Sequence, residues 1–252
     1  STISAIDYQI GSGSFTSTGL TSAGDFTISP LTNGVSATIT LRVTSNGFGS
    51  TTTSSATATP IGTPTLTGIS VSKGTLNGGT VVVLTGTNLL SPSSVTFGGS
   101  AGVVGAVTAT SISVTTSSHA VGAVTVSVTT SAGTAVSSFA YTYIDLPTTT
   151  SVSVSSITSS SARLSATVTP NFDSTAVTFE YSSNADMSGA VSMVAAGSPV
   201  SVASALEVSA SGLTAGTTYY GRLRAVNSLG TVLSAVATFA TSTPAARADV
   251  SL

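Results

Sequence analysis

Apolar and polar residues alternate along most of the chain, and the alternating runs are short. Residues 124–128 read Val-Thr-Val-Ser-Val, and comparable runs are separated by clusters of Gly, Asn, Pro and Ser. A period of two is that of a strand with one buried face. No convincing stretch with the helical period of 3.6 is longer than about ten residues. The pattern therefore predicts an all-β chain.

Two proline-containing stretches interrupt this strand pattern, at residues 60–64 (PIGTP) and 145–148 (DLPT). Proline has no backbone donor for a sheet and restricts the residue before it, so we place domain boundaries there. The expected units are residues 1–62, 63–145 and 146–243. Residues 244–252 remain as a linker or the start of a further strand or module.

The middle unit contains several motifs of one family. They are GTLNGGT at 74–80, TGTN at 85–88, VTFGG at 95–99 and FAYTY at 139–143. With these motifs, residues 64–144 resemble the IPT/TIG family of immunoglobulin-like domains. The Gly-Gly pairs fall where a hairpin or bulge demands positive φ. We expect Phe97, Phe139 and Tyr141 to anchor the core.

The third unit contains ARLSATVTP at 162–170, VTFEY at 177–181 and GLTAGTTYYGRLRAVNSLGT at 212–231. It resembles a fibronectin type III module of the kind repeated in secreted bacterial proteins. The resemblance implies that Tyr219, which follows the Leu-Thr-x-Gly turn, forms a corner whose hydroxyl bonds to the backbone. The residues from Tyr219 to Arg224 also alternate, which predicts one dry face with Leu223 and one wet face with Arg222.

The first unit resembles a fibronectin type III module in part, through LTNG at 31–34 and ITLRV at 39–43. Ala37 stands where the third unit has Tyr219, and there is no room for two opening strands before Tyr8. We expect a truncated sandwich, whose open edges and uncovered core would be unfavourable. Preceding residues of a longer chain could complete it, or a neighbouring subunit could donate the strands. Residues 248–252 are strand-like and are either the start of another module or such a donated strand.

The amino-acid composition argues against several classes of function for this chain. Only 6% of residues are charged, and six basic against eight acidic residues give a net charge of -2 without a cluster of either sign. We expect no nucleic-acid partner, because binding to phosphates requires clustered positive charge. Cysteine is absent, so disulfides and thiolate metal sites are excluded. No apolar run is long enough to predict a membrane span.

Residues able to catalyse a reaction are few. The only histidine, His119, lies in an expected loop without a nearby acid, so we interpret it as solvated rather than as a triad base. The carboxylates considered for glycoside hydrolysis are scattered through one unit and have no obvious cleft. They are Asp173, Glu180, Asp186 and Glu207. We expect no enzymatic activity, no catalytic residue and no cofactor site.

Some Asp and Asn side chains and the single lysine are candidates for metal binding or covalent crosslinking. The candidate calcium ligands are Asp145, Asn171, Asp173, Asn184 and Asp186. Without a calcium-loop motif, we interpret them as side chains that cap turns, and we predict no metal site. Lys73 is the only lysine, and no acidic residue lies between Asp25 and Asp145. A Lys–Asn crosslink needs an adjacent acid, so we expect Lys73 to be solvated.

These observations favour a non-catalytic array of tandem immunoglobulin-like β-sandwiches from a secreted or surface-displayed bacterial protein. The expected role is a spacer or a self-assembling subunit of a fibre, sheath or adhesin. Its expected partners are copies of itself or adjoining modules, with a surface glycan or protein receptor as a further candidate. Residues 60–64 span only about 16 Å when fully extended, so neighbouring modules must nearly touch.

Two other interpretations remain. The modules could be carbohydrate-binding accessory domains of a secreted enzyme, which an exposed patch of Tyr8, Tyr143 or Tyr220 would favour. They could also be immunoglobulin-like components of a phage virion. The sequence has no tryptophan, and we rank carbohydrate binding below assembly.

Overall fold

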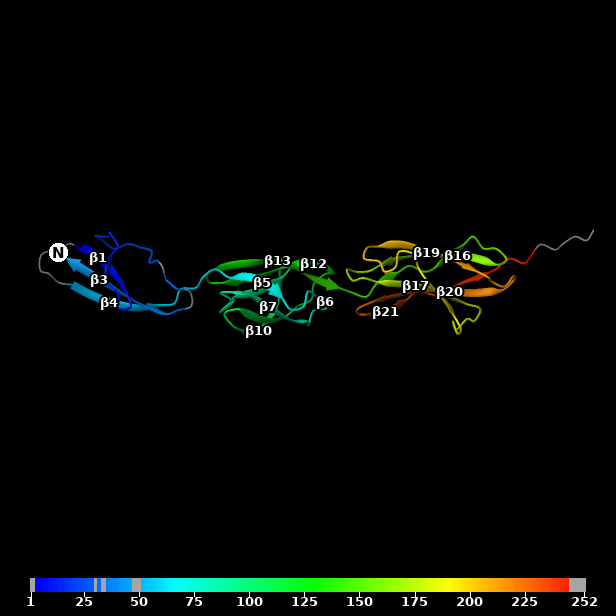
Figure 1. Cartoon of the computed structure of the whole chain (residues 1–252), viewed down its shortest axis with the longest axis horizontal. Helices are drawn as coiled ribbons and strands as arrows, with labels where there is room; N and C mark the ends of the chain where they lie inside the picture. The colour runs from blue at the N-terminus through cyan, green and yellow to red at the C-terminus, as the bar shows by residue number, and fades with distance from the viewer. Residues whose placement is uncertain (1–2, 30, 33–34, 47–50, 245–252) are drawn as a thin grey trace, which may run out of the picture.

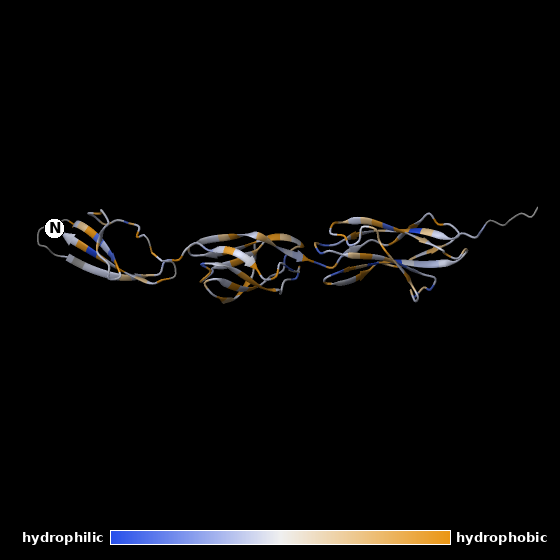
Figure 2. Cartoon of the chain, in the orientation of Figure 1, coloured by the Kyte–Doolittle hydropathy of each residue, from blue (hydrophilic) through white to orange (hydrophobic). Residues whose placement is uncertain are grey.

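The computed structural model describes residues 3–29, 31–32, 35–46 and 51–244. The described residues form strands and connecting loops, without a helix. The strands gather into three groups that follow one another in a row (Figure 1). Apolar and polar positions alternate along the strands of each group (Figure 2). The expected all-β class is confirmed.

The first group is a single sheet with the strand order β2-β1-β3-β4. Its strands are β1 (Ile3–Ile10), β2 (Thr16–Ser17), β3 (Ala37–Ser45) and β4 (Thr51–Ala58). Tyr8 lies opposite Leu41, and Ile6 lies opposite Val43, so one face of the sheet is apolar. The described residues of this group contain no second sheet.

The second group is a sandwich of two sheets, ordered β10-β11-β7-β5 and β6-β13-β12-β8-β9. Its strands are β5 (Thr65–Ile69), β6 (Lys73–Thr75), β7 (Val81–Thr87), β8 (Ser94–Phe97), β9 (Ser100–Ala101), β10 (Val103–Val107), β11 (Ser111–Thr115), β12 (Gly122–Thr130) and β13 (Gly133–Ile144). Leu84 and Ile112 from one sheet face Phe97, Val126 and Tyr141 from the other, and all five are fully buried.

Alternation explains why this core forms. The burial of β7 switches at every residue from Val81 to Thr87, as a strand covered on one face requires. The expected anchors Phe97 and Tyr141 are fully buried and meet edge to face, with ring centroids 5.1 Å apart. Phe139 packs against the same core and is partly buried. All four glycines of the two predicted Gly-Gly pairs have positive φ.

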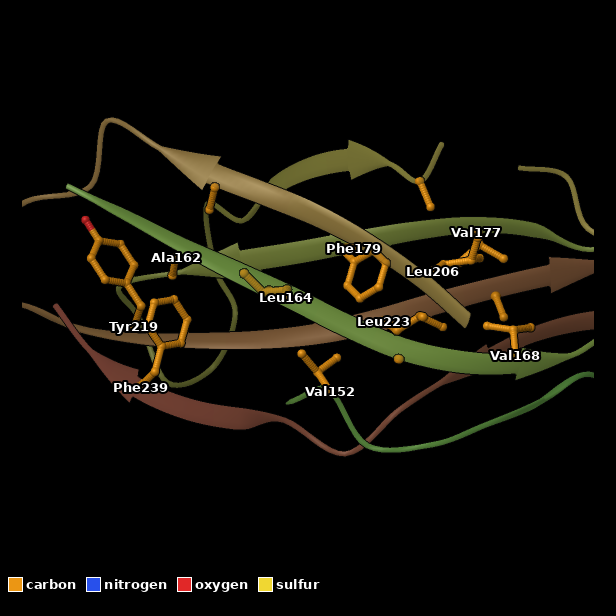
Figure 3. Close-up of a cluster of buried hydrophobic side chains, with 14 of the residues drawn as sticks. Val152, Ala162, Leu164, Val168, Val177, Phe179, Leu206, Tyr219, Leu223 and Phe239 are labelled. Carbon is orange, nitrogen blue, oxygen red and sulfur yellow. The ribbon is translucent and has the colours of Figure 1, made fainter. Parts of the chain in front are cut away.

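The third group is also a sandwich. One sheet has the path β14-β16-β15 with β19 on β16, and the other has the order β18-β17-β20-β21 with β22 on β20. Its strands are β14 (Thr148–Thr149), β15 (Ser153–Ser155), β16 (Ser161–Thr169), β17 (Ala176–Ser182), β18 (Val191–Val194), β19 (Ser204–Ser211), β20 (Thr218–Asn227), β21 (Gly230–Leu233) and β22 (Ala237–Ala240). Leu164, Phe179 and Leu223 from facing sheets fill the space between them (Figure 3).

The predicted tyrosine corner is present in this sandwich. Tyr219 is buried and stacks on Phe239, and its hydroxyl accepts a 3.0 Å hydrogen bond from the backbone N–H of Thr214. The predicted alternation of β20 is also confirmed, because Leu223 is fully buried while Arg222 is partly exposed and Arg224 is exposed. The fibronectin type III identity of this unit and of the first one stays a prediction.

Candidate functional site: the joint between the second and third groups

The second and third groups meet end to end at residues 145–147, and side chains from both sides contact each other there. Lys73 begins β6 at the edge of a sheet in the second sandwich. Asp173 lies in the turn between β16 and β17 of the third sandwich. The Lys73 Nζ lies 2.6 Å from the Asp173 Oδ1, so an ion pair joins the two sandwiches.

The Asp173 side chain is almost completely buried, with 6% of its surface exposed, whereas Lys73 is 48% exposed. The second carboxylate oxygen accepts a 2.8 Å hydrogen bond from the backbone N–H of Ser228. Burial by itself would raise the pKa of Asp173, but the hydrogen bonds from Lys73 and Ser228 and the lysine charge outweigh it. The pKa of Asp173 is therefore held below its usual value.

Two asparagines of the third sandwich bind the linker. The Asn227 Nδ2 donates to the carbonyl of Asp145 at 2.7 Å, and its Oδ1 accepts from the backbone N–H of Leu229 at 3.0 Å. The Asn171 Nδ2 donates to the carbonyl of Leu146 at 2.7 Å. These bonds give two linker carbonyls a hydrogen-bond donor, and they attach the linker to the third sandwich.

The turn that carries Asp173 has an unusual backbone. Asn171 and Phe172 both have positive φ, at 51° and 64°, a region that is uncommon for a bulky residue. The turn is closed by a hydrogen bond from the Asp173 N–H to the Pro170 carbonyl at 3.2 Å. Phe172 is 58% exposed, and among the described residues it is the only aromatic side chain in the exposed class. It lines a shallow depression with Pro170 and Val202.

The joint corrects the interpretation of Lys73 as a merely solvated residue. Its partner, Asp173, is far away in the sequence and comes close only because the sandwiches abut. The arrangement does not support a covalent crosslink, because the lowered pKa of Asp173 keeps its carboxyl group ionised and an amide bond forms from a neutral carboxyl group. Sequence reasoning also missed Asn227, Ser228 and Phe172. The one available signal was the Asn227–Gly230 turn at the end of an alternating strand.

The four carboxylates considered for glycoside hydrolysis are not brought together. Asp173 pairs with Lys73, Glu180 accepts a 2.7 Å hydrogen bond from the Arg222 Nε, and Glu207 pairs with Arg163. Asp186 accepts from the backbone N–H of Ser188 at 2.9 Å, and hydrogen bonds with Ser188 lower its pKa. Each carboxylate therefore has a partner of its own at a different place.

The candidate calcium ligands are likewise divided between the joint and a separate loop. Asp145, Asn171 and Asp173 lie at the joint, where they bind the linker, Lys73 and backbone groups. Asn184 and Asp186 lie in the loop between β17 and β18 and bind Ser188. Within the residues that the structure describes, no three His, Cys, Asp or Glu side chains are grouped so as to hold a metal ion.

His119 is in the predicted loop between β11 and β12, but it is packed rather than freely solvated. Its ring stacks on that of Tyr143, with centroids 5.0 Å apart, and its Nδ1 lies 2.8 Å from the Ala120 carbonyl. Tyr143 is fully buried and donates to the Ser117 carbonyl. Burial, together with neighbouring Tyr141, raises the pKa of Tyr143 to about 12. Tyr143 is therefore not part of an exposed aromatic patch, and the prediction that it could be is wrong.

Acid should loosen the joint. A carboxyl with a lowered folded-state pKa contributes stability that is present above its unfolded pKa of about 4, and the contribution disappears as the pH falls through the folded value. We expect the joint to stay closed at about pH 4, the pKa of the unfolded carboxyl, and to open only at a lower pH, when the Asp173 carboxylate becomes protonated. Small-angle scattering of the chain at decreasing pH would show this as a loss of the extended shape before either sandwich unfolds. An unchanged profile down to the pH of unfolding would contradict the expectation.

Comparison with protein families gives a match that covers the second sandwich. The family model "IPT/TIG domain" matches residues 64–143. No match to the chain is found among the curated proteins. The described residues contain no apolar helix of the length that a bilayer crossing requires.

Several solved structures match parts of the chain at low sequence identity. The sensor domain of the anti-sigma factor RsgI4 from Pseudobacteroides cellulosolvens is 20% identical, with 40% of this chain and 98% of that chain covered and a TM-score of 0.31. Titin domains A168–A170 are 16% identical over 81% of this chain and 74% of that chain, with a TM-score of 0.40. The extracellular region of plexin A4 is 19% identical over 72% of this chain and 15% of that chain, with a TM-score of 0.34. The family match, together with the two-sheet fold and the glycine turns described above, shows that residues 64–143 are an IPT/TIG domain.

Proposed function

We propose that this chain is a non-catalytic structural segment of a secreted or surface-displayed bacterial protein, in which β-sandwich modules act as a spacer within a fibre, sheath or adhesin. The observation that carries the proposal is the joint. The ion pair between Lys73 and Asp173 and the hydrogen bond from Asn227 to Asp145 hold two sandwiches end to end. A spacer needs this property, because a flexible linker would let the modules fold back on each other.

The low charge of the chain supports assembly with copies of itself. The edge strand β4 contains only Thr, Ser and Ala, and the edge strand β18 contains Val, Ser and Met, so neither carries a charged residue. Charged side chains on edge strands normally prevent association between sheets. Their absence from these two edges favours lateral contact between molecules.

Carbohydrate binding is less well supported. Tyr143 is buried, Tyr8 packs on Phe26 with centroids 5.7 Å apart, and Tyr220 is partly buried in β20. Phe172 is exposed but stands alone, whereas sugar platforms use several coplanar rings. We therefore prefer the structural role.

The stiffness of the joint tests the proposal directly. The chain has no cysteine, so Ser138→Cys and Ser192→Cys would attach one spin label to each sandwich without side reactions. Both positions are exposed. We expect one narrow distribution of distances between the labels in the parent chain. Lys73→Gln should broaden it, because the ion pair across the joint is lost.

The matched control is Arg163→Gln, which removes an ion pair with Glu207 on the surface of the third sandwich, away from the joint. Its distance distribution should equal that of the parent chain. If the parent distribution is already broad, the joint is flexible and the spacer proposal is wrong.

A further inference from the structure

The chain enters and leaves the second sandwich at opposite ends. Residues 60–64 lead into β5 at one end, and β13 ends at Ile144, next to the linker that leads to the third sandwich. The strands lie roughly along the row of groups (Figure 1). A pull on the two linkers therefore acts along the strands, and it acts first on the segments nearest the linkers.

These two segments are bonded directly to each other. β6 follows β5 in the entering segment and pairs with the end of β13, and the two strands run parallel. Residues 73–75 lie opposite residues 142–144. Two further backbone hydrogen bonds flank these pairs. They run from the Thr142 N–H to the Ser72 carbonyl at 2.8 Å and from the Leu76 N–H to the Ile144 carbonyl at 3.0 Å.

The parallel direction of β6 and β13 decides how these bonds are loaded. A pull on the entering segment draws β6 back toward residue 64, and a pull on the linker draws β13 forward toward residue 145. The two strands can then separate only by sliding past each other. Backbone hydrogen bonds run between the strands, so sliding strains all of them at once rather than one after another. Such a contact opens slowly under force, because several bonds must be lost in one step.

Gly74 allows β6 to lie close to the core beneath it. A Cβ atom at this position would clash with the Tyr141 hydroxyl oxygen and with the Thr80 Oγ1. Tyr141 is fully buried and has no room to move away. The contact between β6 and β13 therefore depends on a residue without a side chain in the middle of β6.

In the third sandwich, the described residues show no backbone pairing between the first and last strands. The entering strands β14 and β15 pair with β16, and the last strand, β22, pairs with β20 in the other sheet. One backbone hydrogen bond, from the Ser242 N–H to the Thr158 carbonyl at 3.0 Å, joins the chain beyond these strands. A pull on this sandwich can therefore detach a short terminal strand while the rest of the module is still folded.

We infer that, of the two sandwiches, the second is the one that withstands tension along the chain, and that its resistance lies in the parallel contact between β6 and β13. The third sandwich yields first and lengthens under load, while the second stays folded. The inference rests on the proposed spacer role, since a spacer within a fibre or sheath is pulled from both ends. It assigns different mechanical roles to the two modules.

Force spectroscopy on single molecules of the full chain, held at both ends, tests the inference. Each sandwich should unfold in its own step. The third releases more chain because its strands span residues 148–240, whereas those of the second span residues 65–144. At constant force, we expect the third sandwich to unfold at least about tenfold faster than the second. Equal rates, or faster unfolding of the second sandwich, would overturn the inference without the need for any substitution.

Two substitutions separate resistance to force from ordinary stability. Thr142→Pro removes the N–H that bonds to Ser72 but leaves the pairing of β13 with β12, because this N–H points to the side of β6. It should raise the unfolding rate of the second sandwich under force at least about fivefold. Ile112→Ala instead leaves a cavity in the core, where Ile112 is fully buried in the opposite sheet.

Ile112→Ala should lower the stability to chemical denaturation at least as much as Thr142→Pro, yet it should change the unfolding rate under force less. Its cavity destabilises the folded state but leaves the bonds between β6 and β13 in place. A larger acceleration under force by Ile112→Ala than by Thr142→Pro would show that the core, rather than this contact, carries the load. The inference would then be wrong.

Lys73→Gln distinguishes the contact from the joint. It keeps the backbone of β6 and removes only the ion pair with Asp173, so the unfolding rate of the second sandwich under force should stay within about twofold of the parent rate. A much larger effect would place the resistance in the joint and would contradict the inference. The spin-label distances report the stiffness of the joint and not the strength of either sandwich, so failure of the spacer role and failure of this inference can be told apart.

Discussion

Replacing Leu223 by alanine should lower the free energy of unfolding of the third sandwich by about 3 kcal/mol or more. Leu223 is completely buried between two sheets and belongs to the main core cluster. Removal of its side chain loses apolar burial and leaves a cavity that the rigid sheets cannot close. Chemical denaturation followed by segment-resolved hydrogen exchange would measure the loss and show that the IPT/TIG domain is unaffected.

Leu41→Ala is the matched control for this substitution. Leu41 holds the corresponding place in the first sheet, opposite Tyr8, but it is partly exposed. Its truncation should cost less than about 2 kcal/mol. Equal losses at the two positions would mean that the first sheet is covered in solution as fully as the third sandwich.

Gly86→Ala should disrupt the IPT/TIG domain severely. Gly86 lies in β7, and a Cβ atom at this position would be 1.8 Å from the carbonyl oxygen of Thr65 in β5. That atom belongs to the backbone, so β5 as a whole would have to move away from β7. We expect a loss of at least about 3 kcal/mol, at the upper end of what overpacking costs. Thermal unfolding followed by circular dichroism would show a lower midpoint for this domain.

Gly105→Ala serves as the control in the same sheet. Its Cβ would meet no atom closer than 3.4 Å, which is ordinary van der Waals contact. The change in stability should stay within about 0.5 kcal/mol. A comparable loss at both glycines would indicate that strand flexibility, rather than the clash with Thr65, determines the stability.

The contacts of the joint between the second and third sandwiches should respond differently to salt and acid. Lys73 is half exposed, so its pair with Asp173 will weaken with salt as well as with acid. The Asn171 and Asn227 bonds to linker carbonyls carry no charge and should be insensitive to salt. The joint thus combines an ion pair that salt and acid weaken with hydrogen bonds that salt should leave unchanged.

Fold class and the IPT/TIG domain could be predicted because their signals are local. A strand with one buried face alternates at every second residue, and positive φ favours glycine, so residues 81–87 and the two Gly-Gly pairs indicated their structure without knowledge of their neighbours. The tyrosine corner was implied by the resemblance of the third unit to a fibronectin type III module, and it is a local feature, since Tyr219 and its partner Thr214 lie in one turn.

The joint and the packing of His119 could not be predicted in this way. Lys73 and Asp173 are brought together by the stacking of two separate sandwiches, and no local pattern around either residue reports the other. His119 stacks on Tyr143 because the loop after β11 lies over the end of β13, which depends on how the two sheets face each other.

The sequence by itself therefore determined which residues form strands, which face of each strand is apolar and where the chain turns, since these follow from side-chain chemistry over a few residues. Only the tertiary structure decided which strands cover which faces, which charges are paired across modules and which apolar face the described residues leave partly uncovered. These features arise from contacts between segments far apart in the chain, and their energies depend on distance and burial in three dimensions.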